Sequence, residues 1–527
     1  MNAEQRFLHT LTRPALADMS LEHTLAQLWG WMEDVHASLS HHATHVYNWD
    51  KHSALRQQCQ GLSTLSQRIL VQSEQEWDAQ QHARALAQHF DNTLIVLIFG
   101  KFNAGKSSLC NFLAERLGDP EQIKHFQFTQ GHVVYSEQGF LEGATETTAT
   151  VQGVEIGEHL VLLDTPGLHS TTPDNAALTL RYTESADAIL WLSSSTSPGQ
   201  VQELDELARE LQRRKSLLPV ITRSDFYDED LINGEICKVL CNKTTDTRRQ
   251  QEQDLNARAH SKLEQLGVDL RLLRPAVSVS VHMARAQGQN DASQQQSAGL
   301  ERLYTALAEL AAPALAYKQR KPAEVLLHHL QETVQTPLEQ QLLPELQALR
   351  DMLHAEHQHI LTSTSHIGQA VWRTLMSALP TWIQAQANSP EHLTPYDKAQ
   401  NVCQQLSAAL EAQLLAQLSQ TLPQWPIHLL TNAATLTHFM AQHPFTPPPT
   451  LPTQDWTEKL YHHLREAVQQ CLHPSELRPV LTPYVLAVED LLEASQHMTD
   501  LLEQHLQALH AQAMRIQDHM PAPHLAV

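Results

Sequence analysis

The residues best placed to do chemistry form a glycine-rich loop within residues 94–108, LIVLIFGKFNAGKSS. Gly100 and Gly105 are separated by four residues, and Lys106 and Ser107 follow directly. Glycines let backbone N–H groups approach an anionic phosphate, a lysine can reach the β and γ oxygens, and a serine hydroxyl can ligate Mg²⁺. This spacing predicts a binding site for a nucleoside triphosphate.

A buried strand before this loop and a helix after it are needed to position it. Residues 94–99 are an unbroken apolar run with β-branched members, which is typical of a strand buried on both faces. Residues 107–113 fit the helix that follows. The expected nucleotide contacts of the loop are Gly100, Asn103, Ala104, Gly105, Lys106, Ser107 and Ser108.

A second strand end carries residues suited to a metal ion and a γ-phosphate. Residues 160–163 run into Asp164, and Thr165, Pro166 and Gly167 follow. A carboxylate at a strand tip can hold Mg²⁺ through water, and the Gly167 N–H can meet the γ-phosphate. We therefore expect Asp164 and Gly167 to belong to the same site as the glycine loop.

The threonine-rich residues 145–150, TETTAT, come just before an expected strand at residues 151–156. A threonine from a mobile loop can complete a Mg²⁺ site when the nucleotide is bound. Thr148 is the first choice for this ligand and Thr147 the second, although such a stretch could also be plain strand and turn. The long interval between Ser107 and Thr148 also predicts an insertion.

A third strand end carries a carboxylate that could recognise a base. Residues 217–221 lead to Thr222, Arg223, Ser224 and Asp225. An acceptor-only carboxylate can take both the N1 and N2 protons of guanine, whereas adenine lacks the N2 amino group. TRSD alone could be a helix N-cap, but its place after a strand and downstream of Asp164 favours selection of GTP over ATP.

Composition restricts the class of protein. A chain of 527 residues exceeds one hydrophobic core and predicts about two to four domains. The net charge of −22 argues against general attraction to nucleic acid, and no nucleic-acid partner is expected. Six cysteines are too few for a disulfide framework, and no apolar run reaches the roughly 18 residues of a membrane span. We expect a cytoplasmic protein whose membrane contact, if any, is peripheral.

Glycine and leucine divide the chain into regions. Of the 17 glycines, 14 lie between Gly100 and Gly299, where apolar strand candidates alternate with helical patterns. The flanking regions have helical composition, and two apolar stripes with helical spacing indicate bundle core, with a lipid or partner groove as the alternative. The first stripe bends near two prolines, Pro337 and Pro344. The stripes are Leu326, Leu330, Val334, Leu338, Leu342, Leu346, Leu349 and Leu353, then Val488, Leu492, Leu502, Leu506 and Leu509.

The predicted fold class is α/β: a phosphate-loop nucleotide-binding domain with a mostly parallel sheet, plus a large all-α bundle. Residues 91–315 are the expected nucleotide-binding domain. Residues 1–90 are the expected N-terminal helical segment, and it should pack with a C-terminal helical stalk at residues 316–527. The two flanking regions should then form one composite domain, because each carries apolar faces that need a partner.

These motifs, in this order on strand ends, resemble those of the translation-factor-type GTPases. The base-recognition motif of that family is Asn/Thr-Lys-x-Asp, and here Arg223 replaces the lysine. The aliphatic stem and planar head of an arginine can still cover a purine face. Ser280, followed by Val281 and His282, resembles the Ser-Ala-Lys motif of the family and implies a guanine contact at Ser280.

The flanking residues narrow this resemblance. FNAGKSSL at the loop, DTPGL at Asp164 and SADAILWL at residues 185–192 are similar to the bacterial dynamin-like large GTPases, in particular the enterotoxin-output type. This implies hydrolysis of GTP to GDP with Mg²⁺, coupled to a helical stalk. It also implies self-assembly, as a dimer of nucleotide-binding domains or larger, a sister dynamin-like partner, and a lipid surface such as the inner membrane. The alternative is a nucleotide-dependent interaction switch or ribosome-associated GTPase without a membrane role.

Phe102 and Asn103 depart from the eukaryotic dynamins, which carry a catalytic glutamine and a serine at these two positions. Asn103 instead resembles the asparagine of potassium-dependent GTPases, which ligates a monovalent cation between the phosphates. The resemblance thus implies K⁺ as a further cofactor. The alternative is that Asn103 only makes hydrogen bonds within the loop.

Four further features have less specific interpretations. Residues 318–321, KQRK, predict a solvated hinge or a contact with lipid headgroups. Cys237 and Cys241 are expected to share a helix face. Residues 444–452, PFTPPPTLP, predict a stiff linker. The histidines of residues 354–359 fit a solvated helix face better than a metal site.

Overall fold

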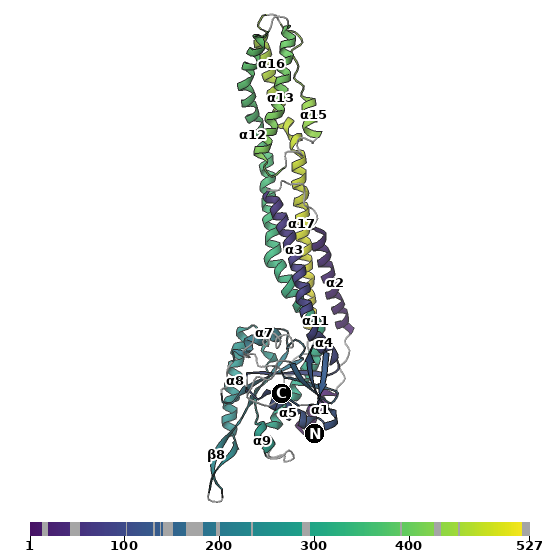
Figure 1. Cartoon of the computed structure of the whole chain (residues 1–527), viewed down its shortest axis with the longest axis vertical. Coiled ribbons are helices and arrows are strands. Elements are labelled where there is room, and N and C mark those ends of the chain that lie inside the picture. The colour runs from purple at the N-terminus through teal and green to yellow at the C-terminus, as the bar shows by residue number, and fades with distance from the viewer. Residues whose placement is uncertain are drawn as a thin grey trace. The chain divides into compact units, whose positions relative to one another are not determined.

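A computed structural model describes most of the chain, which divides into two compact units (Figure 1). The sheet unit comprises Met1–Trp31, Gln72–Thr333 and Leu509–Val527, and the helical unit comprises Met32–Val71 and Val334–Ala508. The described residues are 1–12, 19–42, 53–101, 103–129, 132–137, 139–140, 151–164, 183–196, 201–232, 235–286, 296–389, 393–425, 434–451 and 454–518.

An eight-stranded sheet organises the sheet unit, in the order β10-β7-β6-β1-β5-β4-β2-β3. The first five strands in this order are parallel, and β4, β2 and β3 are antiparallel. The mostly parallel sheet predicted from the sequence is therefore confirmed. The strands are β1 (Leu94–Gly100), β2 (Ile123–Thr129), β3 (His132–Ser136), β4 (Val151–Ile156), β5 (Leu160–Asp164), β6 (Ala188–Ser194), β7 (Ser216–Thr222) and β10 (Val277–Ser278).

Two further strands, β8 (Asp225–Ile232) and β9 (Glu235–Asn242), form a separate antiparallel ribbon. Figure 1 shows this ribbon extending away from the sheet. Cys237 and Cys241 lie on β9, so the predicted helix there is wrong. The β-branched and aromatic residues of both segments favour paired strands.

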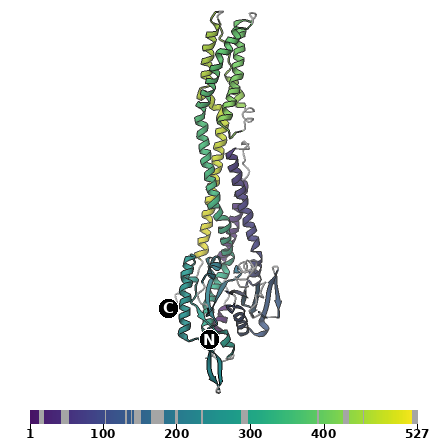
Figure 2. The same ribbon diagram turned by 60° about the vertical axis from the view of Figure 1, so that its left-hand side comes forward.

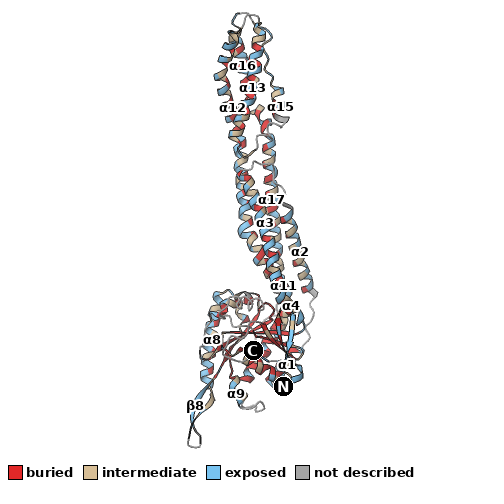
Figure 3. Cartoon of the chain, in the orientation of Figure 1, coloured by how far each residue is buried: buried red, intermediate tan, exposed pale blue. Residues whose placement is uncertain are grey.

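Strand β1 shows why helices cover both faces of the sheet. All seven of its residues are buried, and they alternate between two hydrophobic cores. Leu94, Val96 and Ile98 face the core that contains α1 (Ala3–Leu11), α5 (Lys106–Leu117) and α11 (Leu300–Leu330). Ile95 and Phe99 face the core that contains α4 (Gln81–His89), α7 (Glu203–Gln212) and α8 (Thr245–Gln265). This alternation is the period of two expected for a strand. Figure 3 shows buried residues concentrated along the central strands.

The helices of the sheet unit include α5, which follows the glycine loop directly, and α1, which comes from the chain's start. They are α1 (Ala3–Leu11), α4 (Gln81–His89), α5 (Lys106–Leu117), α7 (Glu203–Gln212), α8 (Thr245–Gln265), α9 (Val281–Ala286) and α11 (Leu300–Leu330), with 3₁₀ turns at Pro120–Gln122 and Leu270–Leu272.

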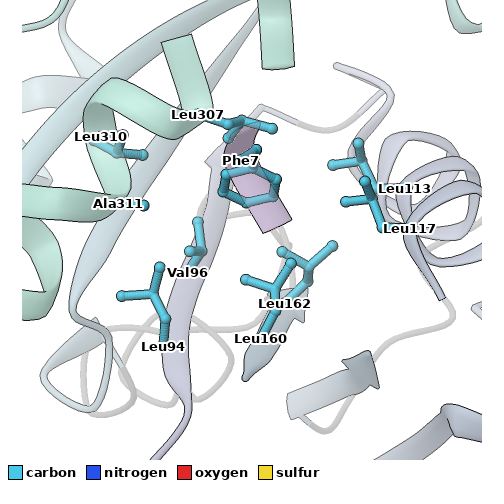
Figure 4. A pocket seen from close by; sticks show the side chains of 10 residues that line it. All are labelled: Phe7, Leu94, Val96, Leu113, Leu117, Leu160, Leu162, Leu307, Leu310 and Ala311. Atoms are coloured by element: carbon cyan, nitrogen blue, oxygen red, sulfur yellow. The ribbon is translucent and has the colours of Figure 1, made fainter. Parts of the chain in front are cut away.

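Helix α1 packs into the core of the sheet unit. Its apolar residues Ala3, Phe7 and Leu11 recur every four positions and are buried beside α5 and α11. The sequence prediction grouped all of residues 1–90 with the stalk; that boundary and the one at residue 315 stay predictions. A small apolar cavity of about 10 Å³ remains at this contact, and Figure 4 shows the residues that line it.

The helical unit is built from long helices contributed by both ends of the chain. Its elements are α2 (Met19–His42) and α3 (Ala54–Ala79) in part, π-helical turns at Gln331–Gln335 and Leu338–Leu342, and α12 (Leu343–Ala387), α13 (Pro395–Thr421), α15 (Ala434–Gln442), α16 (Trp456–Cys471) and α17 (Pro474–Asp518).

N- and C-terminal segments pack together in the helical unit, as the sequence predicts. Gln58 Nε2 donates to Glu345 Oε2 at 2.6 Å, and Ser38 Oγ lies 3.1 Å from His505 Nε2. Figures 1 and 2 show residues 54–71 of α3 running beside helices from the C-terminal half. The whole first apolar stripe is buried, and so are Val488, Leu502 and Leu509 of the second, which confirms their interpretation as core. Residues 443–451 are not helical.

No described helix is both long enough and apolar enough to cross a membrane.

Candidate nucleotide-binding site

The glycine loop joins β1 to α5 at the carboxyl edge of the parallel strands. Gly100 has φ 151°, and a Cβ there would lie 2.4 Å from the Leu192 carbonyl oxygen of the neighbouring strand. Gly105 has φ 85° and directly precedes α5. Both positions therefore need glycine. Strand, loop and helix N-terminus come in the order that presents backbone N–H groups to phosphate.

Lys106 is buried at the first position of α5. Its Nζ donates to the carbonyl oxygens of Gly100 and Lys101, each at 3.0 Å. Burial lowers the pKa of Lys106, and the negative charge of Asp164 opposes that shift. The ammonium group is thus held against the loop where a phosphate chain would lie.

Ser107 and Asp164 meet across the adjacent strand ends. Because β1 and β5 pair in parallel, Asp164 at the end of β5 lies beside the start of the loop, and Ser107 Oγ donates to its Oδ2 at 2.6 Å. Burial raises the pKa of Asp164, while Lys106 and the Ser107 hydrogen bond oppose that change. The carboxylate is almost fully buried, and its Oδ1 has no hydrogen-bond partner among the described residues.

The Ser107 hydroxyl and the Asp164 carboxylate fit Mg²⁺, which prefers hard oxygen ligands and retains several waters. An unpartnered buried carboxylate oxygen is unfavourable unless a cation or donor completes it. Ser107 and Asp164 would hold the ion, which would neutralise phosphate charge. Thr148 and Gly167, which have expected roles, lie outside the described residues, as do Thr147 and Phe102.

The base-recognition residues lie at or just beyond the ends of two parallel strands, β7 and β10. Thr222 Oγ1 donates to the Ala104 carbonyl oxygen at 2.7 Å and so ties the end of β7 to the glycine loop. Ser280, which follows β10, donates through Oγ to Asp225 Oδ2. The structure therefore brings together Asp225 and Ser280, which are 55 residues apart in the sequence. Arg223 is exposed and has φ 54°.

Asn103 is exposed in the loop and has φ 62°. Asparagine adopts this left-handed conformation more readily than most residues. The position is thus consistent with both interpretations of Asn103, as a cation ligand and as a residue chosen for the shape of the loop.

The cations at residues 318–321 are neither a solvated hinge nor a lipid contact. Lys321 is buried, and its Nζ donates to Asp187 Oδ1 at 2.8 Å. Lys318 Nζ donates to Asp187 Oδ2 at 3.2 Å, and Arg320 lies 3.7 Å from Glu324. Sequence reasoning missed this cluster, although an aspartate directly before a buried strand needs a partner.

The histidines at residues 354–359 make helix-to-helix contacts. His357 Nε2 lies 3.1 Å from Glu489 Oε1, and His359 Nε2 lies 2.8 Å from the Thr421 carbonyl oxygen. Among the described residues, no three or more His, Cys, Asp or Glu side chains come together as metal ligands.

The glycine loop, the Ser107–Asp164 pair and the strand order define the sheet unit as a nucleotide-binding domain of the phosphate-loop type. Residues 95–223 match the family model described as 50S ribosome-binding GTPase.

A protein of Acinetobacter baylyi (strain ATCC 33305 / BD413 / ADP1), the uncharacterized protein ACIAD1444, is 43% identical over 415 residues, which cover 79% of this chain and 81% of that protein. The chain belongs to the same family as this Acinetobacter protein.

Solved structures of bacterial dynamins are similar over most of the chain. LeoA, a bacterial dynamin GTPase from ETEC, is 13% identical with a TM-score of 0.32, covering 99% of this chain and 100% of that chain. One chain of an oligomerised bacterial dynamin pair, described as sensing and tethering membranes over long range, is 14% identical with a TM-score of 0.30, covering 95% and 76%.

Proposed function

We propose that this protein is a dynamin-like GTPase that hydrolyses GTP to GDP in the presence of Mg²⁺. Lys106 would stabilise negative charge on the transferred phosphate, and Ser107 and Thr148 would be Mg²⁺ ligands. Asp164 would help to hold the ion, and the Gly167 N–H would meet the γ-phosphate. Bound Mg²⁺ supplies charge neutralisation at the phosphates.

The observation that carries this proposal is the contact between Ser107 and Asp164. Two motifs separated by 57 residues meet there through a 2.6 Å hydrogen bond, beside the buried Lys106 ammonium. The remaining carboxylate oxygen lacks a partner among the described residues. A hydroxyl, a carboxylate and an ammonium at one loop match the needs of a metal-bound triphosphate.

We assign the selection of guanine to the Asp225 carboxylate, which the Ser280 hydroxyl orients. The Ser280 hydroxyl donates to one oxygen of the Asp225 carboxylate, which fixes the orientation of that group. Thr222 and Arg223 complete the base-binding segment, and the hydrogen bond from Thr222 to Ala104 connects it to the phosphate loop. A carboxylate fixed in this way accepts two donors from guanine and would face an unsatisfied acceptor with adenine.

Isothermal calorimetry with GTP and ATP tests this assignment. The wild type should bind GTP far more tightly than ATP, and Asp225→Asn should relax the preference toward xanthosine nucleotides because the acceptor pattern changes. Asp228→Asn, exposed on the same strand, is the matched control and should retain the preference. Equal affinities of the wild type for GTP and ATP would refute the guanine assignment.

For the output, we propose that the nucleotide state is coupled to rearrangement of the helical unit, to self-assembly and to peripheral membrane or vesicle remodelling at the inner membrane. The chain passes into the helical unit through the π-helical turn Gln331–Gln335, and such turns often mark functional hinges. A sister dynamin-like protein is the proposed partner. Domain boundaries at residues 90 and 315 belong to the same proposal.

The second candidate is a ribosome-associated or other interaction switch with no membrane role, which the description of the matching GTPase family model favours. Co-sedimentation with liposomes and, separately, with ribosomes discriminates between the two. Binding to liposomes that increases with a GTP analogue, and that is lost in Lys106→Ala, supports the membrane role. Nucleotide-dependent binding to ribosomes alone supports the switch.

A further inference from the structure

The base-recognition segment, residues 222–225, is the first part of a larger arrangement that the β8–β9 ribbon completes. Asp225 is the first residue of β8 and pairs with Asn242, the last residue of β9. The ribbon therefore begins at Asp225, the base-recognition carboxylate, and its last residue, 17 positions later in the sequence, lies beside Asp225 again. Lys243 is the next residue after the ribbon.

Lys243 holds the base-recognition segment in place through hydrogen bonds from both its backbone and its side chain. Its backbone N–H donates to the Ser224 carbonyl oxygen at 3.0 Å. Its Nζ donates to Ser195 Oγ at 2.9 Å, and Ser195 Oγ in turn donates to the Arg223 carbonyl oxygen. The ammonium group is thus one hydroxyl away from the backbone of the segment.

Ser195 and Arg248 donate further hydrogen bonds to backbone carbonyl groups of the segment. The Ser195 N–H donates to the Thr222 carbonyl oxygen at 2.9 Å. Arg248 donates to the Ser224 carbonyl oxygen at 2.9 Å and to Asn242 Oδ1 at 2.7 Å. The carbonyl groups of residues 222–224 therefore each accept a hydrogen bond. Two of the donors, the Lys243 N–H and Arg248, follow or contact Asn242, the last residue of the ribbon.

We propose that Lys243 is a positioning residue that sets guanine specificity, in the absence of a lysine at position 223. This inference rests on the guanine assignment of the proposed function. The ammonium acts in two ways: its hydrogen bond orients Ser195 against the Arg223 carbonyl, and its charge lies close enough to Asp225 to interact with it. Arg223 itself is exposed and has a left-handed backbone with φ 54°.

The physical consequence concerns the 2-amino group of guanine. Two hydrogen bonds to one carboxylate demand a narrower orientation than one, so a loosened segment loses more affinity for a base with two donors than for a base with one. Hypoxanthine has the N1 proton but lacks the 2-amino group. The ratio of affinities for GDP and IDP therefore reports the orientation of Asp225, which a general loss of stability would not change.

The test measures the dissociation constants of GDP and IDP by calorimetry for full-length variants. Lys243→Met should weaken GDP by about tenfold, the effect of one hydrogen bond from a charged group, and weaken IDP less, so that the GDP preference falls at least about threefold. Lys243→Arg should restore the preference because a guanidinium can also donate to Ser195. Lys238→Met removes an exposed charge from the same ribbon and should behave as the wild type.

Ser195→Ala provides a second route if Lys243→Met does not fold, because it removes the bridging hydroxyl and leaves the charge in place. It should also lower the GDP preference over IDP. An unchanged preference in either folded variant would overturn the inference while leaving the proposed function intact. A wild type that binds GDP no better than ADP would instead refute the guanine assignment and, with it, this role of Lys243.

Discussion

Asp187 offers the sharpest test of how the sheet unit is held together. Its side chain is fully buried at the start of β6, where Oδ2 accepts from the Ile95 N–H at 2.8 Å. Lys321 and Lys318 donate to the same carboxylate at 2.8 and 3.2 Å. Burial would raise the pKa of Asp187, but the two ammonium groups hold it below its usual value. Asp187→Asn keeps the size of the side chain and removes the charge.

The expected loss follows from what remains after the substitution. Two ammonium groups, of which Lys321 is fully buried among the surrounding residues, lose their only shared carboxylate. Breaking a buried ion pair by removal of one partner costs about 3–5 kcal/mol. Local opening of β1 and β6 should then become more frequent by about two to four orders of magnitude.

Hydrogen exchange read by mass spectrometry measures this opening directly in peptides that cover β1 and β6. A single melting curve would be harder to interpret, because a chain with two units need not unfold in one step. Asp254→Asn is the control, since its ion pair with Arg258 is about half exposed and should contribute less than about 1 kcal/mol. The double variant Asp187→Asn/Lys321→Met should recover part of the protection, because it removes the unpaired ammonium. Protection of β1 in Asp187→Asn equal to that in Asp254→Asn would refute the reasoning.

The remaining predictions concern the proposed site and one buried lysine. Lys106→Ala should lose nucleotide binding, whereas Thr148→Ala should retain GDP affinity and lose hydrolysis by about 10²-fold; a wild-type rate in Thr148→Ala would move the role to Thr147 or refute it. Hydrolysis should be faster in KCl than in NaCl at matched ionic strength, increasingly so at high protein concentration, and Asn103→Ser should remove the difference; equal rates would leave Asn103 a residue of loop shape. Asp164→Asn should increase the hydrogen-exchange protection of β5 in the nucleotide-free protein, because burial raises the pKa of this carboxyl and so disfavours its charge at neutral pH. It should also abolish the effect of Mg²⁺ on GTP binding, and an unchanged Mg²⁺ response would exclude Asp164 from the metal site. Burial lowers the pKa of Lys321 to about 8, below its value of about 10.4 in an unfolded chain. The unfolded state therefore binds more protons between these pH values than the folded state does. The free energy of unfolding should rise with pH across that window in the wild type but not in Lys321→Met.

Local chemistry made the sheet and its loops predictable from the sequence. The apolar run before the glycine loop is β1, the expected strand at residues 151–156 is β4, and residues 160–164 form β5. Each is short, apolar and bounded by turn residues, which is the pattern that distinguishes buried strands best. The predicted insertion after Ser107 contains the β2–β3 hairpin, which extends the sheet.

The β8–β9 ribbon could not be predicted in the same way. Its first strand is rich in acidic residues and follows a helix-cap-like motif, and the spacing of Cys237 and Cys241 fits one face of a helix and one face of a strand equally well. Only pairing between the two segments decides for strands, and such pairing is invisible in either segment alone.

Buried charge escaped prediction for a different reason. A run such as residues 318–321 is usually solvated, and its partner Asp187 lies more than 130 residues earlier in the sequence. The helix that carries the run, α11, buries charged side chains as well as apolar ones: Lys321 and Glu324 are buried along with several leucines. Periodicity of apolar residues cannot reveal a polar inward face.

This buried charge has a consequence for residues 183–187, which come directly before β6. Thr183 and Glu184 present carbonyl oxygens to Lys215 Nζ at 2.6 and 3.0 Å, and Asp187 is held by Lys318 and Lys321. A buried ion pair adds little to stability compared with an apolar contact, but separating its partners is strongly unfavourable. The network therefore penalises every arrangement in which α11 leaves the start of β6. Any change that a nucleotide imposes on this segment must move α11 with it or lose contacts worth several kcal/mol.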